Sequence, residues 1–301
     1  MTAVAKAPLV TPKSIPRRVP IWVVLGKVLR RKPSRMVGVG IIALFLLMAV
    51  FGPVIYSKLP IDTNNVYASP SSTHLLGTDY AGVDVLALVV SGARYVLFSA
   101  LVAAIVTVVV GTAVGLVSGY HRGFTDSALM RVTDFVLTVP GFPLLVVLST
   151  IWSFGAPLQM GFVLGITGWG GLARAVRSQT LSLRERGFLE AARALGLPTR
   201  HVITREVLPN IAPYIAMNLL LAVTGAIYAQ VGLFFLGIVP PTANNWGVML
   251  NNAVFNAGAL TSTQALPYLL SPLICILVLT LGIVLVVDAM DELFNPRLRA
   301  R

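Results

Sequence analysis

The sequence contains few charged residues and almost no cysteine. Asp, Glu, Lys and Arg make up 11% of its 301 residues, whereas a water-soluble chain typically carries about 25%. Hydrophobic residues make up 56%, and the mean hydropathy is +0.84. Because so few charges cannot cover a globular surface, we expect the chain to lie in a lipid bilayer. The single cysteine, Cys275, excludes an intrachain disulfide and a cysteine metal cluster.

The sequence also lacks the motifs of an enzyme that converts energy. It has no Gly-x-x-x-x-Gly-Lys-[Ser/Thr] motif, since Gly26-Lys27 is followed by Val28 and no glycine stands at the required upstream position. It has no nucleophile elbow either. The three histidines share no spacing typical of metal ligands: His74, His121 and His201. We therefore expect no catalytic residue, no metal and no bound cofactor on this chain, so any ATP that drives it must be hydrolysed by another chain.

Hydrophobic segments long enough to cross a membrane recur along the chain. A hydrocarbon core about 30 Å thick needs about 20 apolar residues in a helix. Six segments fit this length, the fourth being short and rich in glycine: 37–56, 95–119, 133–152, 160–176, 212–236 and 268–287. The sequence therefore predicts an all-α polytopic membrane protein with six transmembrane helices. An even number of spans places both termini on the same side.

The distribution of Lys and Arg indicates which side that is. Of the 23 Lys and Arg residues, all but Lys58 and Arg94 lie before the first span, after the sixth, or in the two connections on the same side. Positive residues are concentrated on the cytoplasmic side of membrane proteins, so we expect both termini to be cytoplasmic. The first apolar run is too long for the core of a secretory signal peptide, and we interpret it as an uncleaved span.

The middle parts of the predicted spans carry no Asp, Glu, Lys or Arg. An ion-coupled carrier usually has ionisable residues at mid-membrane, so their absence argues against a secondary transporter. Asp134 and Asp288 lie near predicted cytoplasmic ends, where a charge costs little. Any pore would be lined by apolar, Gly, Ser, Thr and Asn side chains.

Small residues and prolines mark special points in the second and third spans. Gly111, Gly115 and Gly119 form a stripe on one helix face, which predicts close helix packing, with a hinge or pore-facing role as the alternative. Pro140 and Pro143 predict a kink in the third span. Three aspartates of the external segment are expected to cap turns or helices rather than bind ligands: Asp62, Asp79 and Asp84.

The longest polar segment between spans, 174–210, has the pattern of two short helices. Ser182 and Glu185 have the spacing of a capping box that starts the first helix. Gly196 is expected to end that helix, and Pro198 prevents its continuation. We expect a second helix, capped by Thr199 and ended by Pro209, so that the segment projects into the cytosol. The alternative is an amphipathic helix that lies on anionic lipid.

Six residues of this segment form a motif: Glu190, Ala191, Ala192, Gly196, Leu208 and Pro209. Their identity and spacing resemble the EAA loop of ABC importer permeases. The resemblance implies that this loop docks in a groove on a separate ATPase subunit. It implies that Glu190 and Gly196 set the docking geometry, with Ala191 and Ala192 as the close-contact surface.

Residues outside the loop narrow the resemblance. His74-Leu75-Leu76-Gly77-Thr78-Asp79, Gly92-Ala93-Arg94, Phe235-Leu236-Gly237 and Asn295-Pro296-Arg297 look like the corresponding segments of the C-type permease in dipeptide, oligopeptide and nickel importers. The similarity covers about residues 70–300 and implies the type I ABC importer permease fold.

The resemblance also implies an organisation and a set of partners. We expect a basic cytoplasmic segment (1–35), a first transmembrane helix (36–56), an extracytoplasmic loop (57–90), a permease core (91–290) with its coupling loop (177–210), and a cytoplasmic tail (291–301). The implied partners are a second homologous permease, two cytoplasmic ATPase subunits that hold ATP and Mg, and an extracytoplasmic substrate-binding protein. The implied location is the bacterial plasma membrane, and the implied function is import of dipeptides or oligopeptides.

Other functions remain open on the sequence alone. The same machinery could carry nickel complexes or oligosaccharides. A passive channel or membrane anchor would need no docking loop, and a secondary transporter would follow an ion gradient without ATP. A nucleic-acid binder could use the basic N-terminus, but Arg30-Arg31-Lys32 adjoins a span, and membrane orientation explains these charges more simply.

Overall fold

The computed structural model describes residues 32–56, 59, 61–152, 155–241 and 244–294, and most of these are helical. The predicted segment 1–35, apart from its last four residues, and the Asn295-Pro296-Arg297 motif lie outside the described residues. The helices are α2 (Pro33–Ile55), α3 (Val85–His121), α4 (Gly123–Thr138), α5 (Gly141–Ile151), α6 (Pro157–Gly168), α7 (Gly170–Arg184), α8 (Gly187–Ala194), α9 (Thr199–His201), η1 (Val202–Val207), α10 (Leu208–Phe235), α11 (Trp246–Asn251), η2 (Asn252–Asn256), η3 (Thr263–Ala265) and α12 (Leu266–Phe294). Within the described residues, extended pairing is limited to two isolated bridges, Ile61 with Val83 and Thr78 with Asp84.

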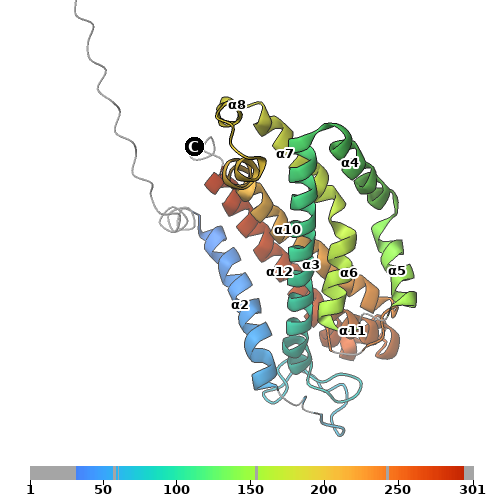
Figure 1. Cartoon of the computed structure of the whole chain (residues 1–301). Coiled ribbons are helices and arrows are strands. Elements are labelled where there is room, and N and C mark those ends of the chain that lie inside the picture. The colour runs from blue at the N-terminus through green and yellow to red at the C-terminus, as the bar shows by residue number, and fades with distance from the viewer. Residues whose placement is uncertain (1–31, 57–58, 60, 153–154, 242–243, 295–301) are drawn as a thin grey trace, which may run out of the picture.

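The 37-residue helix α3 is the centre of the bundle (Figure 1). It packs against α2, α6, α7, α10 and α12, while α2 and α12 also pack on each other. Its sequence is rich in Val, Ala and Leu, and the Asp84 carboxylate caps its start by accepting a hydrogen bond from the Ala87 N–H at 2.9 Å. The helix begins at Val85, ten residues before the span predicted at 95–119 and inside the predicted loop 57–90.

The bundle has the surface of a membrane protein. Many of its outward-facing side chains are large and apolar; on α2, for example, Leu44, Leu47 and Phe51 are more than half exposed. Among the described residues, four helices are long and apolar enough to cross a membrane: α2, α3, the continuous stretch from α9 to α10, and α12 with η3. The pair α4–α5 makes a fifth if the two helices form one span.

The predicted spans at 133–152 and 160–176 are not single helices. The first is broken between α4 and α5, which lie at 82° to each other. Pro140 stands in this break, so the predicted kink is confirmed but is a complete interruption of the helix. The second is divided at Trp169 into α6 and α7, of 12 and 15 residues.

Glycines allow α6 and α7 to pack closely along α3, in parallel with it. A Cβ atom at Gly111 would lie 3.0 Å from the Trp169 carbonyl oxygen, and one at Gly115 would lie 2.6 Å from that of Ala173. At Gly119 the nearest atom would be the Thr180 Cβ, at 2.7 Å. The predicted packing role of this glycine stripe is therefore confirmed.

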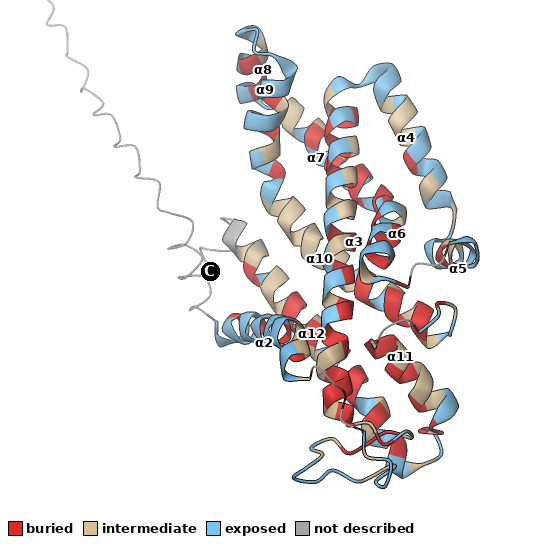
Figure 2. Cartoon of the chain, turned by 60° about the horizontal axis from the view of Figure 1, so that its bottom comes forward, coloured by how far each residue is buried: buried red, intermediate tan, exposed pale blue. Residues whose placement is uncertain are grey.

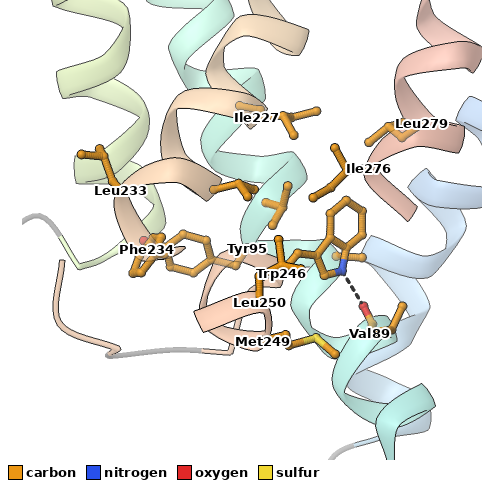
Figure 3. Close-up of a cluster of buried hydrophobic side chains, with 14 of the residues drawn as sticks. Val89, Tyr95, Ile227, Leu233, Phe234, Trp246, Met249, Leu250, Ile276 and Leu279 are labelled. Atoms are coloured by element: carbon orange, nitrogen blue, oxygen red, sulfur yellow. Dashed lines mark hydrogen bonds between the residues drawn. The ribbon is translucent and has the colours of Figure 1, made fainter. Parts of the chain in front are cut away.

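The main hydrophobic core lies at one end of the bundle, around Trp246 of α11 (Figure 3). Trp246 is fully buried, and its indole N–H donates a hydrogen bond to the Val89 carbonyl oxygen at 3.0 Å. Its ring packs edge-on against Phe45 of α2, and Tyr95 of α3 packs in the same manner on Phe234 of α10. Buried residues are dense here, whereas the outer faces of the helices are exposed (Figure 2). We call this region the Trp246 end.

The connection between α2 and α3 folds against the Trp246 end. Each predicted capping aspartate in it accepts hydrogen bonds from its own segment, as expected. Asp79 accepts from the N–H groups of Ala81 and Val83, both at 2.8 Å, while Asp62 accepts from the Asn64 N–H at 3.0 Å. Burial raises the pKa of the Asp79 carboxyl above its ordinary value, although these backbone hydrogen bonds lower it. His74 Nδ1 lies 2.8 Å from the Asp84 carboxylate and so fixes the loop to the start of α3.

Candidate docking site in the 177–210 loop

The predicted coupling loop 177–210 lies at the opposite end of the bundle, which we call the α8 end (Figure 1). It consists of the last part of α7, then α8, α9 and η1, and the start of α10. The predicted capping box is wrong. Ser182 lies inside α7 and Glu185 is the residue at its C-terminal end, so α8 begins only at Gly187 and has no side-chain cap. Packing against α3 extends α7 through this region, since the buried Thr180 lies against Gly119.

Gly196 ends α8 as predicted, and the geometry shows why glycine stands there. Its φ is +67°, in the left-handed region that side chains disfavour. Its N–H donates to the Arg193 carbonyl oxygen at 2.9 Å, and the Leu197 N–H donates to that of Ala192 at 3.2 Å. These two hydrogen bonds are those of a Schellman motif. The turn therefore fixes the direction in which the chain leaves α8.

The second helix of the loop differs from the prediction at both ends. Thr199 is the first residue of α9 rather than its cap, and Pro198 occupies the capping position. Pro209 does not end the helix, because α9, η1 and α10 run on as one continuous helix from Thr199 to Phe235. Proline lacks an N–H and crowds the preceding turn; the wider π-helical turn of η1, where the Leu208 N–H bonds five residues back to Ile203, lies directly before it.

Helix α8 has one buried and one exposed face. Leu189 is completely buried and Ala192 is only 7% exposed. On the other side Phe188, Ala191 and Leu195 recur at helical spacing, and Leu195 is 79% exposed. We call these three residues the α8 ridge. An exposed apolar stripe on a short helix at the end of the bundle is typical of a surface that binds another protein.

The six motif residues do not all share this exposed face. Glu190 and Ala191 are exposed, as are Gly196 and Pro209, while Leu208 is half-buried. Ala192 is buried, so it cannot belong to the close-contact surface that was predicted for it with Ala191. The reason is its position one turn after Leu189, on the face that packs inward.

A second, smaller hydrophobic cluster lies between α8 and the rest of the bundle. It joins Leu189 and Ala192 to buried residues of α3, α7, η1 and α10: Leu116, Leu172, Val176, Val202, Val207 and Ile211. The buried face of α8 therefore belongs to the same apolar cluster as residues of α3, α7, η1 and α10. The cluster links the exposed loop to helices that run toward the Trp246 end.

Ion pairs tie the helices together at the α8 end. Arg177 of α7 makes two hydrogen bonds, both of 2.6 Å, to the Asp126 carboxylate of α4, a bidentate pair. Arg174 and Asp134 join the same two helices at 2.5 Å. Arg177 and Asp126 lie outside the predicted spans, and Asp134 and Arg174 lie near the ends of two of them, but no local spacing indicated which charges meet.

Tyr120, at the end of α3, contacts two arginines that the sequence did not single out. The guanidinium carbons of Arg184 and Arg193 lie 5.9 and 5.8 Å from the centre of its ring. Arg184 donates to the Tyr120 carbonyl oxygen at 2.8 Å, and Arg193 donates to that of Arg184 at 3.0 Å. These residues come from α3, α7 and α8, so only the folded chain brings them together.

The helices also line an open cavity of about 390 Å³. It is lined by residues of α3, α5, α6, α7 and α10 together with Gly141 and Gly168 at helix ends, and its polar side chains include Thr107, Thr167 and Asn218. The remaining lining residues are Ala, Gly, Leu and Phe. Among the described residues, no group of three or more His, Cys, Asp or Glu side chains could hold a metal ion.

Comparison with known proteins agrees with this arrangement. Residues 111–300 match the family described as the binding-protein-dependent transport system inner membrane component, and residues 22–70 match the N-terminal TM domain of oligopeptide transport permease C. The oligopeptide transport system permease protein OppC of Bacillus subtilis (strain 168) is 31% identical over 274 residues, which cover 90% of this chain and 88% of the relative. A probable peptide ABC transporter permease protein of Sinorhizobium fredii is 33% identical over 91% of this chain and 93% of its own length.

The dipeptide transport system permease protein DppC of Bacillus subtilis (strain 168) is 33% identical over 230 residues, which cover 75% of this chain and 71% of the relative. The family match covers both the α8 loop and the helices that support it, and the resemblance seen in the motif residues is thereby confirmed. The chain is a multi-pass membrane protein that belongs to the binding-protein-dependent transport system inner membrane component family, the permease subunits of ABC importers.

Proposed function

We propose that this permease forms half of the translocation path of an ATP-driven importer of dipeptides or oligopeptides. Its partners are a second homologous permease, two cytoplasmic ATPase subunits that bind ATP and Mg, and an extracytoplasmic substrate-binding protein. The printed names of the relatives, which are oligopeptide, dipeptide and peptide permeases, support the substrate class. This chain itself binds no cofactor in the proposal.

In this proposal the α8 end lies in the cytosol of a bacterium and the Trp246 end lies outside the plasma membrane. The chain then has six spans: α2, α3, the bent pair α4–α5, the pair α6–α7, α10 and α12. The close packing of α6 and α7 along α3 supports treating them as one crossing. Arginines concentrated in and beside α8 support the orientation.

The observation that carries the proposal is the two-faced packing of α8. Its exposed apolar ridge (Phe188, Ala191, Leu195) can insert into a groove of an ATPase subunit, while the buried Leu189 holds the helix on the bundle. Glu190, exposed beside the ridge, and the Gly196 turn set the docking geometry. An amphipathic helix on lipid would show the same outward apolar ridge, and the match of this region to the permease family supports docking on an ATPase subunit instead.

Movement of the docked ATPase would then reach the spans through the smaller cluster beneath α8. That cluster includes Val176 of α7 and Ile211 of α10, both of which belong to helices that line the 390 Å³ cavity. We propose that this cavity borders the translocation path. Its lining of small and apolar side chains with two threonines and one asparagine suits the passage of varied peptides without strong binding.

The test is uptake into proteoliposomes that contain the assembled complex and a labelled dipeptide or oligopeptide. Glu190→Lys reverses the charge beside the ridge, and Gly196→Trp places a large side chain at a positive φ. We expect both variants to insert into the membrane normally and to lose ATP-dependent uptake. Asp291→Lys is the matched control, because it makes the same charge change at an exposed position of α12, outside the 177–210 loop, and should retain uptake.

Normal uptake by both Glu190→Lys and Gly196→Trp would overturn the docking role. Uptake that follows an ion gradient without ATP would overturn the ATP-driven mechanism. Transport of nickel complexes or oligosaccharides in place of peptides would retain the machinery and correct the substrate. Labelling that finds α8 on the outer face would overturn the orientation.

A further inference from the structure

Helix α8 contacts the bundle mainly through α7 and η1. The central helix α3 shares the smaller cluster with α8 through Leu116. A second, polar contact between them is the Tyr120 junction, which we define as Tyr120, Arg184 and Arg193. Tyr120 stands in the last turn of α3, Arg184 is the last residue of α7, and Arg193 lies near the end of α8. The junction therefore joins three helices at one point.

The contacts in the junction are mutually dependent. Arg193 contacts the Tyr120 ring and also donates to the Arg184 carbonyl oxygen at 3.0 Å. Arg184 contacts the same ring and donates to the Tyr120 carbonyl oxygen at 2.8 Å. The Tyr120 ring also packs edge-on against His121, with 5.6 Å between the ring centres. Removal of the Tyr120 ring would take away the surface that both guanidinium groups share.

Two positive side chains repel each other, so their convergence needs compensation. Burial, followed by the charges of Arg193 and Arg122, lowers the pKa of the Arg184 guanidinium. The face of an aromatic ring attracts cations, and the two carbonyl oxygens accept hydrogen bonds from them. Without the ring, the repulsion between Arg184 and Arg193 would favour separation of α8 from the ends of α3 and α7.

We propose that Tyr120 is a positioning residue that fixes α8 to the end of α3, so that a displacement of α8 by the ATPase moves α3 with it. The inference rests on the proposed function and adds a specific route by which the motion enters the central helix. The smaller cluster, which includes Leu116 of α3, already links α8 to α3, α7 and α10. The Tyr120 junction adds a polar contact between α8 and the end of α3.

The test compares peptide uptake with ATP hydrolysis in the full complex reconstituted in proteoliposomes. Tyr120→Leu removes the ring, and Arg193→Met removes one cation but keeps a long, helix-compatible side chain. Two cation–π contacts of ordinary strength correspond to about a fivefold or larger change in an equilibrium. We therefore expect Tyr120→Leu, which removes both contacts, to lower the number of peptides transported per ATP by about fivefold, and Arg193→Met, which removes one, to lower it by about twofold. ATPase subunits should remain bound at wild-type stoichiometry in both variants.

Three controls separate positioning from general structural damage. Tyr120→Phe keeps the ring and should keep most of the coupling, while Arg131→Gln removes an exposed charge from α4 and should have no effect. The double variant Tyr120→Leu with Arg193→Met should lose no more coupling than the worse single variant, because both break the same link. If Tyr120→Leu does not assemble, Arg193→Met decides the question, since it changes only a partly exposed side chain of α8.

Wild-type coupling in Arg193→Met, or an equal loss in Tyr120→Phe and Tyr120→Leu, would overturn the inference. Additive losses in the double variant would also overturn it. These outcomes differ from failure of the proposed function, in which the wild-type complex itself would show no ATP-dependent uptake.

Discussion

The two ends of the bundle are held together by different kinds of interaction. At the Trp246 end, large side chains of α2, α3, α10 and α11 form one continuous apolar core. Neutral hydrogen bonds lie within this core, as in those of Trp246 to Val89 and of Gln230 to the Val96 carbonyl oxygen at 3.0 Å, while the buried carboxylates Asp79 and Asp84 lie at its edge in the α2–α3 connection. At the α8 end, a smaller cluster is surrounded by ion pairs and cation–π contacts. The first region resembles the interior of a stable domain and the second a surface joined by long charged side chains.

This difference suits a protein that is moved from one end. Apolar packing is dense and resists displacement, whereas charged side chains at a surface can exchange partners at low cost. The Trp246 end would then act as the fixed part of the bundle while the α8 end changes its contacts. Variants that break apolar packing at the Trp246 end, helix packing through glycine, or an ion pair at the α8 end test this difference.

The largest effect is expected for Trp246→Ala. The change removes a fully buried ring and its hydrogen bond to Val89, and loss of a large buried aromatic side chain costs about 3–5 kcal/mol of the free energy of unfolding. The matched control is Trp152→Ala, because Trp152 is 56% exposed and should contribute little. The apparent melting temperatures of the two detergent-solubilised variants give the comparison. Equal losses in both would mean that the Trp246 end is not the stable part of the molecule.

A smaller effect is expected where α3 and α7 pack through glycine. In Gly115→Ala the new Cβ atom would meet the Ala173 carbonyl oxygen at 2.6 Å and the Val176 Cβ at 2.7 Å. Such overpacking costs about 1–3 kcal/mol. Gly171→Ala on α7 is the control, since a Cβ there meets nothing within 4 Å, and helix propensity should make it neutral or slightly stabilising. Thermal unfolding of both variants measures the difference, and a stable Gly115→Ala would mean that the two helices are not in close contact.

Features that depend on the local sequence could be predicted, and the structure confirms several of these predictions. Gly196 ends α8, Asp84 caps α3, and the break at Pro140 follows from the missing N–H of proline. The glycine stripe of α3 also packs as expected, because its spacing repeats on one helix face. Each of these depends on residues a few positions apart in the chain.

Features that depend on contacts between distant segments could not be predicted. The capping box predicted at Ser182 does not form, because packing on α3 keeps that residue inside α7. The prediction that Pro209 ends its helix is wrong, because a π-helical turn precedes this proline and the helix continues. Ala192 was predicted at the surface together with Ala191. In the structure Leu189 packs into the smaller cluster, and this turns Ala192 inward and Ala191 outward. The Tyr120 junction draws on three helices and left no local pattern in the sequence.

A smaller effect again, and one that depends on salt, is expected for Asp126→Asn at the α8 end. The change replaces the carboxylate that accepts two 2.6 Å hydrogen bonds from Arg177, and a partly exposed pair of this kind contributes about 1 kcal/mol or less to the free energy of unfolding. Because salt screens charges near the surface, the loss relative to wild type should shrink between low and high salt. The loss in Trp246→Ala should persist. Asp134→Asn breaks the more exposed ion pair, that between Asp134 and Arg174, whose side chains are 56% and 53% exposed, and should cost less still.

A melting-temperature loss in Asp126→Asn that is as large as that of Trp246→Ala and independent of salt would remove the distinction between the two ends. The α8 end would then be as rigidly packed as the core, which would leave the proposed movement of α8 without a compliant region in which to occur.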